Sequence, residues 1–171
     1  ELEGGHRALQ EAELGVDDLL LAATRRFSAQ AQRKGIALTL GQPSGALLAG
    51  DRFALERMLG NLVDNAIRFT PAGGRVIVAS YAAADGVVLE ITDTGIGMSS
   101  ERLSSLSQPF AYGDAALTRD HEGAGLGLAI ARTIAELSGG RLAIDSRQGL
   151  GTTVAVSLPL HQSALRIDAA A

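Results

Sequence analysis

The stretch Asp93-Thr94-Gly95-Ile96-Gly97-Met98 directly follows Val87-Val88-Leu89-Glu90-Ile91-Thr92, whose alternating apolar residues predict a half-buried strand. A carboxylate at the end of a strand is therefore followed by two glycines one residue apart. Glycine has no Cβ, so it adopts backbone conformations closed to other residues and lets another molecule approach the main chain closely. The same six residues also fit an ordinary turn, and taken alone they leave a binding site and a turn both open.

Composition restricts the class of protein. The chain has 171 residues, of which 46% are hydrophobic, enough for one core and one domain. Its net charge of -4 argues against a nucleic-acid partner held by a broad basic surface. Without cysteine there are no disulfides or cysteine-ligated metals, and the three histidines lack metal-ligand spacing. No apolar run approaches the roughly 18 residues that span a bilayer. No signal peptide opens the chain, and we expect no direct membrane contact from this fragment.

The periodicity of the hydrophobic residues and the positions of glycine and proline predict an order of helices and strands. Helices are expected at 17–34, 51–69, 99–106 and 125–138, and strands at 36–40, 46–49, 75–82, 87–92, 141–146 and 152–158. The segment 107–123 should be a long loop, and loops of that length inside a domain are usually functional, often lids. Helices on one side and a mostly antiparallel sheet on the other predict an α+β, two-layer α/β sandwich. We expect residues 1–15 to be the end of an upstream helix and a linker, 16–160 the domain, and 161–171 a flexible tail.

Two helices have clear apolar faces. In the first, Leu19, Leu20, Ala23 and Phe27 share one side, and Gly35 ends it. Asp51 can cap the second, and Pro71 ends it. Its predicted core face consists of Phe53, Leu55, Met58, Leu59, Leu62, Val63, Ala66 and Ile67.

Three polar residues of the second helix are candidate site residues. Asn61 and Asn65 are four residues apart, so both amides face the same way. Two amides in a helix rich in Leu, Met, Val and Ile are costly unless something satisfies them. They either cap neighbouring loops or contact a ligand. Arg68 shares the neighbourhood and is either a solvated residue or a cation near a phosphate.

The stretch Gly123-Ala124-Gly125-Leu126-Gly127-Leu128 closes the long loop and opens the last helix. Glycines at a helix start expose N–H groups where the helix dipole favours an anion, which suits a phosphate. No Gly-Lys-Ser/Thr follows, so this is not a P-loop. It does not follow a strand directly, which disfavours a dinucleotide fingerprint.

Four ordered motifs together resemble a known family. Asn61–Pro71, Asp93–Met98, Pro109-Phe110 and Gly123–Leu128 are similar, in that order, to the four sequence boxes of bacterial sensor histidine kinase catalytic domains, in the Bergerat-fold (GHKL) superfamily. Residues 149–153 also resemble the family's turn before its last strand. The resemblance covers roughly residues 16–160. It implies a mixed, mostly antiparallel sheet covered on one face by three helices, with a long ATP lid.

The resemblance also implies ligands, ATP and Mg²⁺, and roles for individual residues. Asn65 would coordinate Mg²⁺ through its side-chain oxygen, a hard ligand suited to that ion. Asn61 would support the same site, and Arg68 would contact phosphate. Together these three form the implied catalytic set.

The remaining implied residues bind the nucleotide. Asp93 would accept a hydrogen bond from the adenine amine, while Gly95 and Gly97 would let backbone and ordered water pack against the base. The segment 107–122 would be the lid. Its hinge and phosphate-facing end would be formed by Gly123, Gly125 and Gly127, and Phe110, Leu126 and Thr152 complete the implied binding set.

One residue separates kinases from hydrolases within this superfamily. The hydrolases place a glutamate four residues before the magnesium-binding asparagine to activate water, and this chain has Asn61 there. This favours a protein-histidine kinase. His6 does not match the family's phosphoacceptor pattern, so we expect that histidine in an upstream dimerisation domain, and a response regulator as partner. We expect a cytoplasmic location, whether or not the parent is membrane-anchored, and a homodimeric parent.

Two departures from the family pattern lie around the expected lid. Ser107, two positions before Pro109, replaces a residue that is often aromatic, and Ala111-Tyr112 replaces an aromatic residue followed by a basic one. Arg119 could supply the missing lid cation. These departures leave an alternative open: a degenerate kinase-like domain that acts as a partner-binding signalling scaffold with little kinase activity.

Overall fold

Five strands form a mixed sheet in the order β2-β4-β5-β7-β6 in the computed structural model, which describes residues 12–107 and 124–160. β2 runs parallel to β4, and every other neighbouring pair is antiparallel, as predicted. β4 and β5 form a hairpin, which joins the two strands predicted at 75–82 and 87–92. The strands are β2 (Ala37–Leu40), β4 (Arg75–Ala83), β5 (Gly86–Asp93), β6 (Arg141–Arg147) and β7 (Gly151–Pro159).

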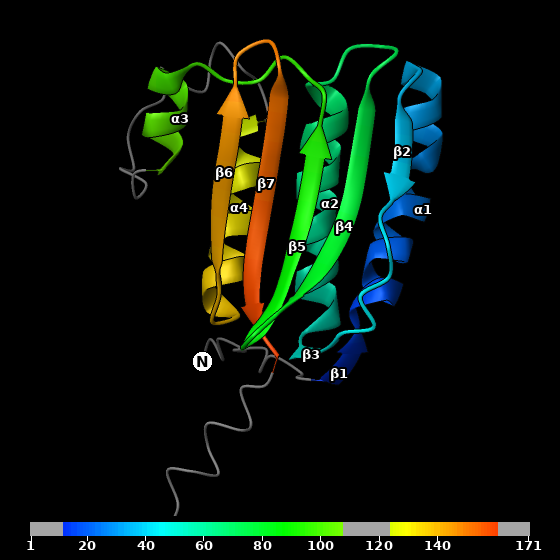
Figure 1. Cartoon of the computed structure of the whole chain (residues 1–171), viewed down its shortest axis with the longest axis vertical. Coiled ribbons are helices and arrows are strands. Elements are labelled where there is room, and N and C mark those ends of the chain that lie inside the picture. The colour runs from blue at the N-terminus through cyan, green and yellow to red at the C-terminus, as the bar shows by residue number, and fades with distance from the viewer. Residues whose placement is uncertain (1–11, 108–123, 161–171) are drawn as a thin grey trace, which may run out of the picture.

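Three helices cover one face of this sheet (Figure 1), and they are α1 (Val16–Lys34), α2 (Arg52–Arg68) and α4 (Ala124–Leu137). The short α3 (Ser100–Ser107) lies beside the β6 edge. The predicted α+β sandwich with three covering helices is therefore confirmed.

The core lies between the helices and the sheet, and α2 contributes most to it. Residues spaced three or four apart on α2 are buried, because that spacing returns to the same side of a helix. The expectation for Phe53 is wrong: this side chain is 69% exposed. It lies two residues before Leu55, and residues two apart do not share a helix face. The predicted face of α1, ending at Phe27, is buried as expected.

A second, two-stranded sheet joins β1 (Ala12–Gly15) to β3 (Leu47–Gly50). Residues 12–15 were expected in the linker. They form a strand because Leu14 is buried against the core and pairs with Leu48, more than thirty residues away, which no local periodicity reveals. The rest of the expected linker and the expected tail lie outside the described residues.

Substitution of the α2 cap is expected to destabilise the domain modestly. The Ala54 N–H donates to the Asp51 carboxylate at 3.2 Å, satisfying one of the N–H groups left open at the helix start. An Asp51→Ala variant should lose about 1 kcal/mol of unfolding free energy in urea denaturation. Asp85→Ala, in the exposed β4–β5 turn, is the matched control. Equal stability of the two variants would contradict the capping role.

Candidate functional site

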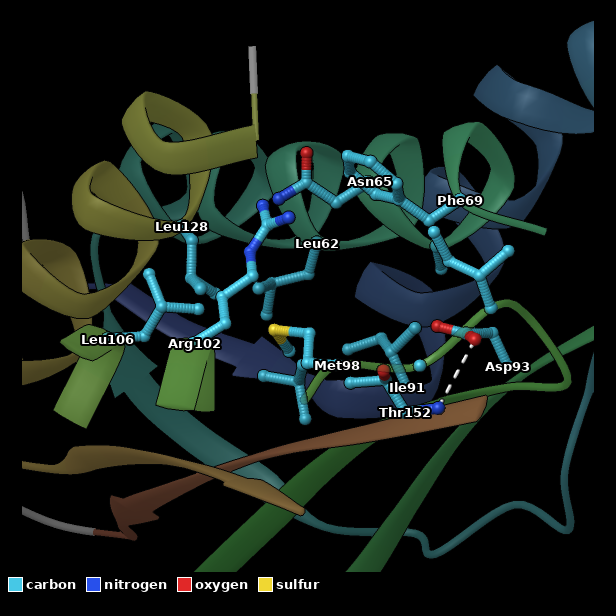
Figure 2. A pocket seen from close by; sticks show the side chains of 14 residues that line it. Leu62, Asn65, Phe69, Ile91, Asp93, Met98, Arg102, Leu106, Leu128 and Thr152 are labelled. Carbon is cyan, nitrogen blue, oxygen red and sulfur yellow. Dashed lines mark hydrogen bonds between the residues drawn. The ribbon is translucent and has the colours of Figure 1, made fainter. Parts of the chain in front are cut away.

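A cavity lies between α2 and the sheet and is bounded by α3 and α4 (Figure 2). Its walls are largely apolar, with four polar side chains that converge on it, the pattern typical of small-molecule sites. The lining residues are Leu62, Asn65, Ala66, Phe69, Ile91, Asp93, Ile96, Gly97, Met98, Arg102, Leu106, Leu128, Thr152 and Val154.

Asp93 ends β5 at one end of this cavity. Its Oδ1 accepts hydrogen bonds from the Gly95 N–H at 2.8 Å and the Thr152 N–H at 3.3 Å. Within residues 12–107 and 124–160, no group donates to its Oδ2, and Figure 2 shows this second oxygen pointing into the cavity. Burial raises the pKa of the Asp93 carboxyl, and the two backbone hydrogen bonds oppose that rise. The fold therefore buries an acceptor and leaves one of its oxygens open to the cavity.

The backbone that supports Asp93 depends on Gly97. This glycine has φ +64, and a Cβ there would lie 2.0 Å from the Arg147 carbonyl oxygen. The Gly149 N–H also donates to the Ile96 carbonyl at 2.7 Å. Gly97 thus permits a close approach within the protein, between the segment after β5 and the β6–β7 turn.

Two hydroxyl groups link Thr152, whose backbone N–H donates to Asp93, to the segment that leads into α3. The Thr152 hydroxyl lies 2.7 Å from the Ser146 hydroxyl, and the Met98 N–H donates to that same Ser146 oxygen at 2.8 Å. Ser146 has no signal in the sequence that assigns it to the site, because its role arises from the β6–β7 pairing. The network couples the position of the carboxylate to the segment that leads into α3.

Asn65 lines the other end of the cavity, and Asn61 lies one helical turn before it. A Cβ on Gly127, in α4, would lie 3.6 Å from the Asn65 amide oxygen and 3.8 Å from the Asn61 Cβ. The beginning of α4 therefore packs against both asparagines. In the described part of the chain, the buried Nδ2 of Asn61 has no hydrogen-bond partner. A buried amide atom without a hydrogen-bond partner is suited to bind a ligand or a water. This holds whichever way the O and N atoms of the amide are assigned.

Some predicted site residues do not line the cavity. Arg68 is exposed and forms an ion pair with Asp64 at 3.0 Å. Leu126 is 71% exposed on α4. Gly125 belongs to the first turn of α4, whereas Phe110, Gly123 and the expected lid from 108 onwards lie outside the described residues.

Several residues that line the cavity were not predicted. Most are apolar, and some share the α2 face that carries Asn65, so helical spacing alone could have identified them. They include Leu62, Ala66, Phe69, Ile91, Met98, Leu106 and Val154. The unpredicted polar residue is Arg102 on α3, for which neither motif nor periodicity gave a signal.

Residues 12–107 and 124–160 hold no group of three or more His, Cys, Asp or Glu side chains that could bind a metal. None of their helices is both long and apolar enough to cross a membrane.

A five-stranded mixed sheet under three helices, with a cavity between an asparagine-bearing helix and a strand-end aspartate, defines the Bergerat-fold class of domains. The family described as histidine kinase-, DNA gyrase B-, and HSP90-like ATPase matches residues 50–162, and the chain belongs to this family.

Individual relatives agree with this membership. The chain is 39% identical over 162 residues to histidine protein kinase DivJ of Caulobacter vibrioides, covering 94% of this chain and 27% of DivJ. Full-length ShkA in complex with AMPPNP is 28% identical with a TM-score of 0.75, covering 89% of this chain and 31% of ShkA. Histidine kinase ThkA in complex with response regulator TrrA shares the fold, with 22% identity, a TM-score of 0.73, and coverage of 92% and 44%. The chain spans about a quarter of the length of DivJ.

Proposed function

We propose that this chain binds Mg-ATP and donates the γ-phosphoryl group to a histidine of an upstream dimerisation domain, within two-component signal transduction to a response regulator. The observation that carries the proposal is that Asp93 and Asn65, from separate motifs, line one cavity. The complex of ShkA with AMPPNP, an ATP analogue, and that of ThkA with a response regulator support it by analogy.

Adenine occupies the Asp93 end of the cavity in this proposal. The open Oδ2 accepts a hydrogen bond from the exocyclic amine of adenine, while guanine presents a carbonyl oxygen at the corresponding position and is repelled. Ile91, Met98 and Leu62 supply apolar contacts to the base. These residues select adenine and exclude water from it.

The phosphates and Mg²⁺ occupy the Asn65 end. An amide oxygen is a hard ligand, and Mg²⁺ usually takes only one or two protein ligands and completes its shell with phosphate and water. Asn65 fits this requirement, although no acidic cluster is present among the described residues. Asn61 does not line the cavity, but its buried Nδ2, which has no partner in the described part of the chain, lies one helical turn away. When bound, the ion neutralises phosphate charge. Asn65 orients the phosphate chain, and Asn61 holds Asn65 and its surroundings in place.

Arg68 stays a predicted phosphate contact. Its ion pair with Asp64 is at the surface, and such pairs contribute about 0–1 kcal/mol, so the side chain can leave Asp64 at little cost. The glycines at the start of α4, with Gly123, Phe110 and the segment 107–122, are proposed to close over the phosphates as the ATP lid.

The chemistry proposed for this domain is positioning and charge neutralisation. The amide of Asn61 cannot act as a general base, so water near the γ-phosphate is not activated by this residue. The nucleotide then persists until an imidazole from the dimerisation domain attacks. The domain is proposed to work in the cytoplasm, whether or not its parent is membrane-anchored, and the parent is proposed to be a homodimer.

The test uses the wild-type chain with its own upstream phosphoacceptor domain. Calorimetry with Mg-ATP and Mg-GTP should show binding of ATP and little binding of GTP. With labelled ATP, label should appear on the phosphoacceptor histidine, and the chain alone should release almost no phosphate. Nucleotide binding without transfer would favour the scaffold alternative that the lid departures at Ser107 and Ala111-Tyr112 suggest. If the chain binds no nucleotide, the placement of adenine at Asp93 and the placement of the phosphates at Asn65 are both wrong.

A further inference from the structure

Arg102 extends from the first turn of α3 into the cavity, and Figure 2 shows its guanidinium directed toward the Asn65 amide. Among residues 12–107 and 124–160, the guanidinium has neither a hydrogen-bond acceptor nor an ion-pair partner. Burial lowers the pKa of Arg102. A guanidinium presents five N–H donors, and partial burial without an acceptor is unfavourable. The position therefore suits an anionic partner that enters the cavity.

The fold attaches α3 at both ends, which sets the direction of Arg102. At the start, the Arg102 N–H donates to the Ser99 hydroxyl at 3.3 Å, and the Met98 N–H donates to Ser146 at 2.8 Å. Near the end, the Arg132 guanidinium of α4 donates to the Leu106 carbonyl at 2.5 Å. Because β6 and α4 both attach to α3, the Arg102 side chain is carried by an anchored element.

The ionisable groups that line the cavity lie at opposite ends of it. Asp93 and Arg102 are the ionisable side chains that line it within the described residues, and Figure 2 shows Asp93 far from the Asn65 end where the guanidinium lies. A carboxylate at one end and a guanidinium at the other suit a ligand with a hydrogen-bond donor at one end and negative charge at the other.

We propose that Arg102 binds the phosphate groups of the nucleotide and distinguishes phosphorylated adenine nucleotides from adenosine. This inference rests on the proposed function, since it takes the base to lie at Asp93. It adds a phosphate-binding cation on α3 to Arg68 and Arg119, the two arginines that the sequence alone indicates. Guanidinium binds phosphate through paired, charge-assisted hydrogen bonds, so a single arginine gives both affinity and orientation.

Calorimetry on Arg102→Gln with ATP, ADP and adenosine tests the proposal. ATP and ADP should bind about tenfold or more weakly than to wild type, the effect of losing a charge-assisted hydrogen bond. Adenosine affinity should be unchanged. Arg102→Lys should recover part of the ATP affinity, because it keeps the charge and loses the paired geometry. The matched control is Arg25→Gln, an exposed arginine on α1, which should bind all three ligands as wild type does.

Other outcomes would overturn the inference. Equal losses for ATP and adenosine would mean that Arg102 contacts the base or only positions α3. Unchanged or increased ATP affinity would mean that the guanidinium does not meet phosphate. Either of these two results would contradict the role of Arg102 without contradicting the proposed function, because in both cases the wild-type chain still binds ATP. If the wild-type chain itself bound no adenine nucleotide, the proposed function would fail instead.

Discussion

An Asp93→Asn variant is expected to bind ATP about 10- to 100-fold more weakly than the wild-type chain, the cost of losing a buried hydrogen-bond acceptor. Asparagine keeps an oxygen for the Gly95 and Thr152 N–H groups, which donate at 2.8 and 3.3 Å. Its amide nitrogen then replaces the open Oδ2 and presents a donor to the adenine amine, which is also a donor. Calorimetric titration with Mg-ATP measures the loss.

The same substitution should leave the fold intact and slightly more stable at neutral pH. Burial raises the pKa of the Asp93 carboxyl above its value in the unfolded chain, so the folded chain holds this proton more readily. The contribution of Asp93 to stability is therefore most favourable below the unfolded pKa and declines as pH rises through the folded pKa. Asparagine removes that decline. Urea denaturation across acidic to neutral pH should show a flatter dependence for the variant.

Asp145→Asn, on the exposed face of β6, is the control and should change neither ATP affinity nor this pH dependence. ATP binding by Asp93→Asn as tight as by wild type would place the base elsewhere. A large loss of stability at neutral pH would mean that the carboxylate is retained for the fold and not for a ligand.

Phosphotransfer by an Asn65→Ala variant should fall on the order of 100-fold or more, the usual effect of removing a preorganised group at a developing charge. Asn65 lines the cavity opposite Asp93, and α4 packs beside its amide at Gly127. In the proposed function the amide oxygen holds the metal-bearing phosphate chain, which would lose that ligand and its orientation in the variant. Adenosine affinity should persist, because the base contacts at Asp93 remain. The measurement is label transfer from ATP to the phosphoacceptor domain.

A second readout does not need turnover. Mg²⁺ should tighten ATP binding to the wild-type chain and have little effect on Asn65→Ala. Stability should change little, because alanine favours a helix interior more than asparagine does. Glu56→Gln on the same helix, which removes only a surface ion pair with Arg52, is the control and should transfer label normally. Full transfer by Asn65→Ala would remove this residue from the catalytic set.

Local spacing determined much of this protein from its sequence alone. The four-residue spacing of Asn61 and Asn65 placed both amides on one side of a helix, and both lie near Gly127. The alternating run before Asp93 became β5, and the apolar spacing of α2 became the core, with Phe53 as the exception. The order of the motifs indicated the family to which the chain belongs. These features depend on periods of two and 3.6 residues, which any short window of sequence contains.

Contacts between distant segments were decided only by the tertiary structure. Thr152 donates to Asp93 across 59 positions, and this pairing selects which carboxylate oxygen remains open. The burial that raises the pKa of Asp93 is likewise a property of the assembled cavity. Ser146 joins the site through the β6–β7 pairing, and Arg102 lines the same cavity as Asn65 because α3 is attached to β6 and α4. Such contacts arise when separate elements pack together, and no residue near them in sequence carries their signal.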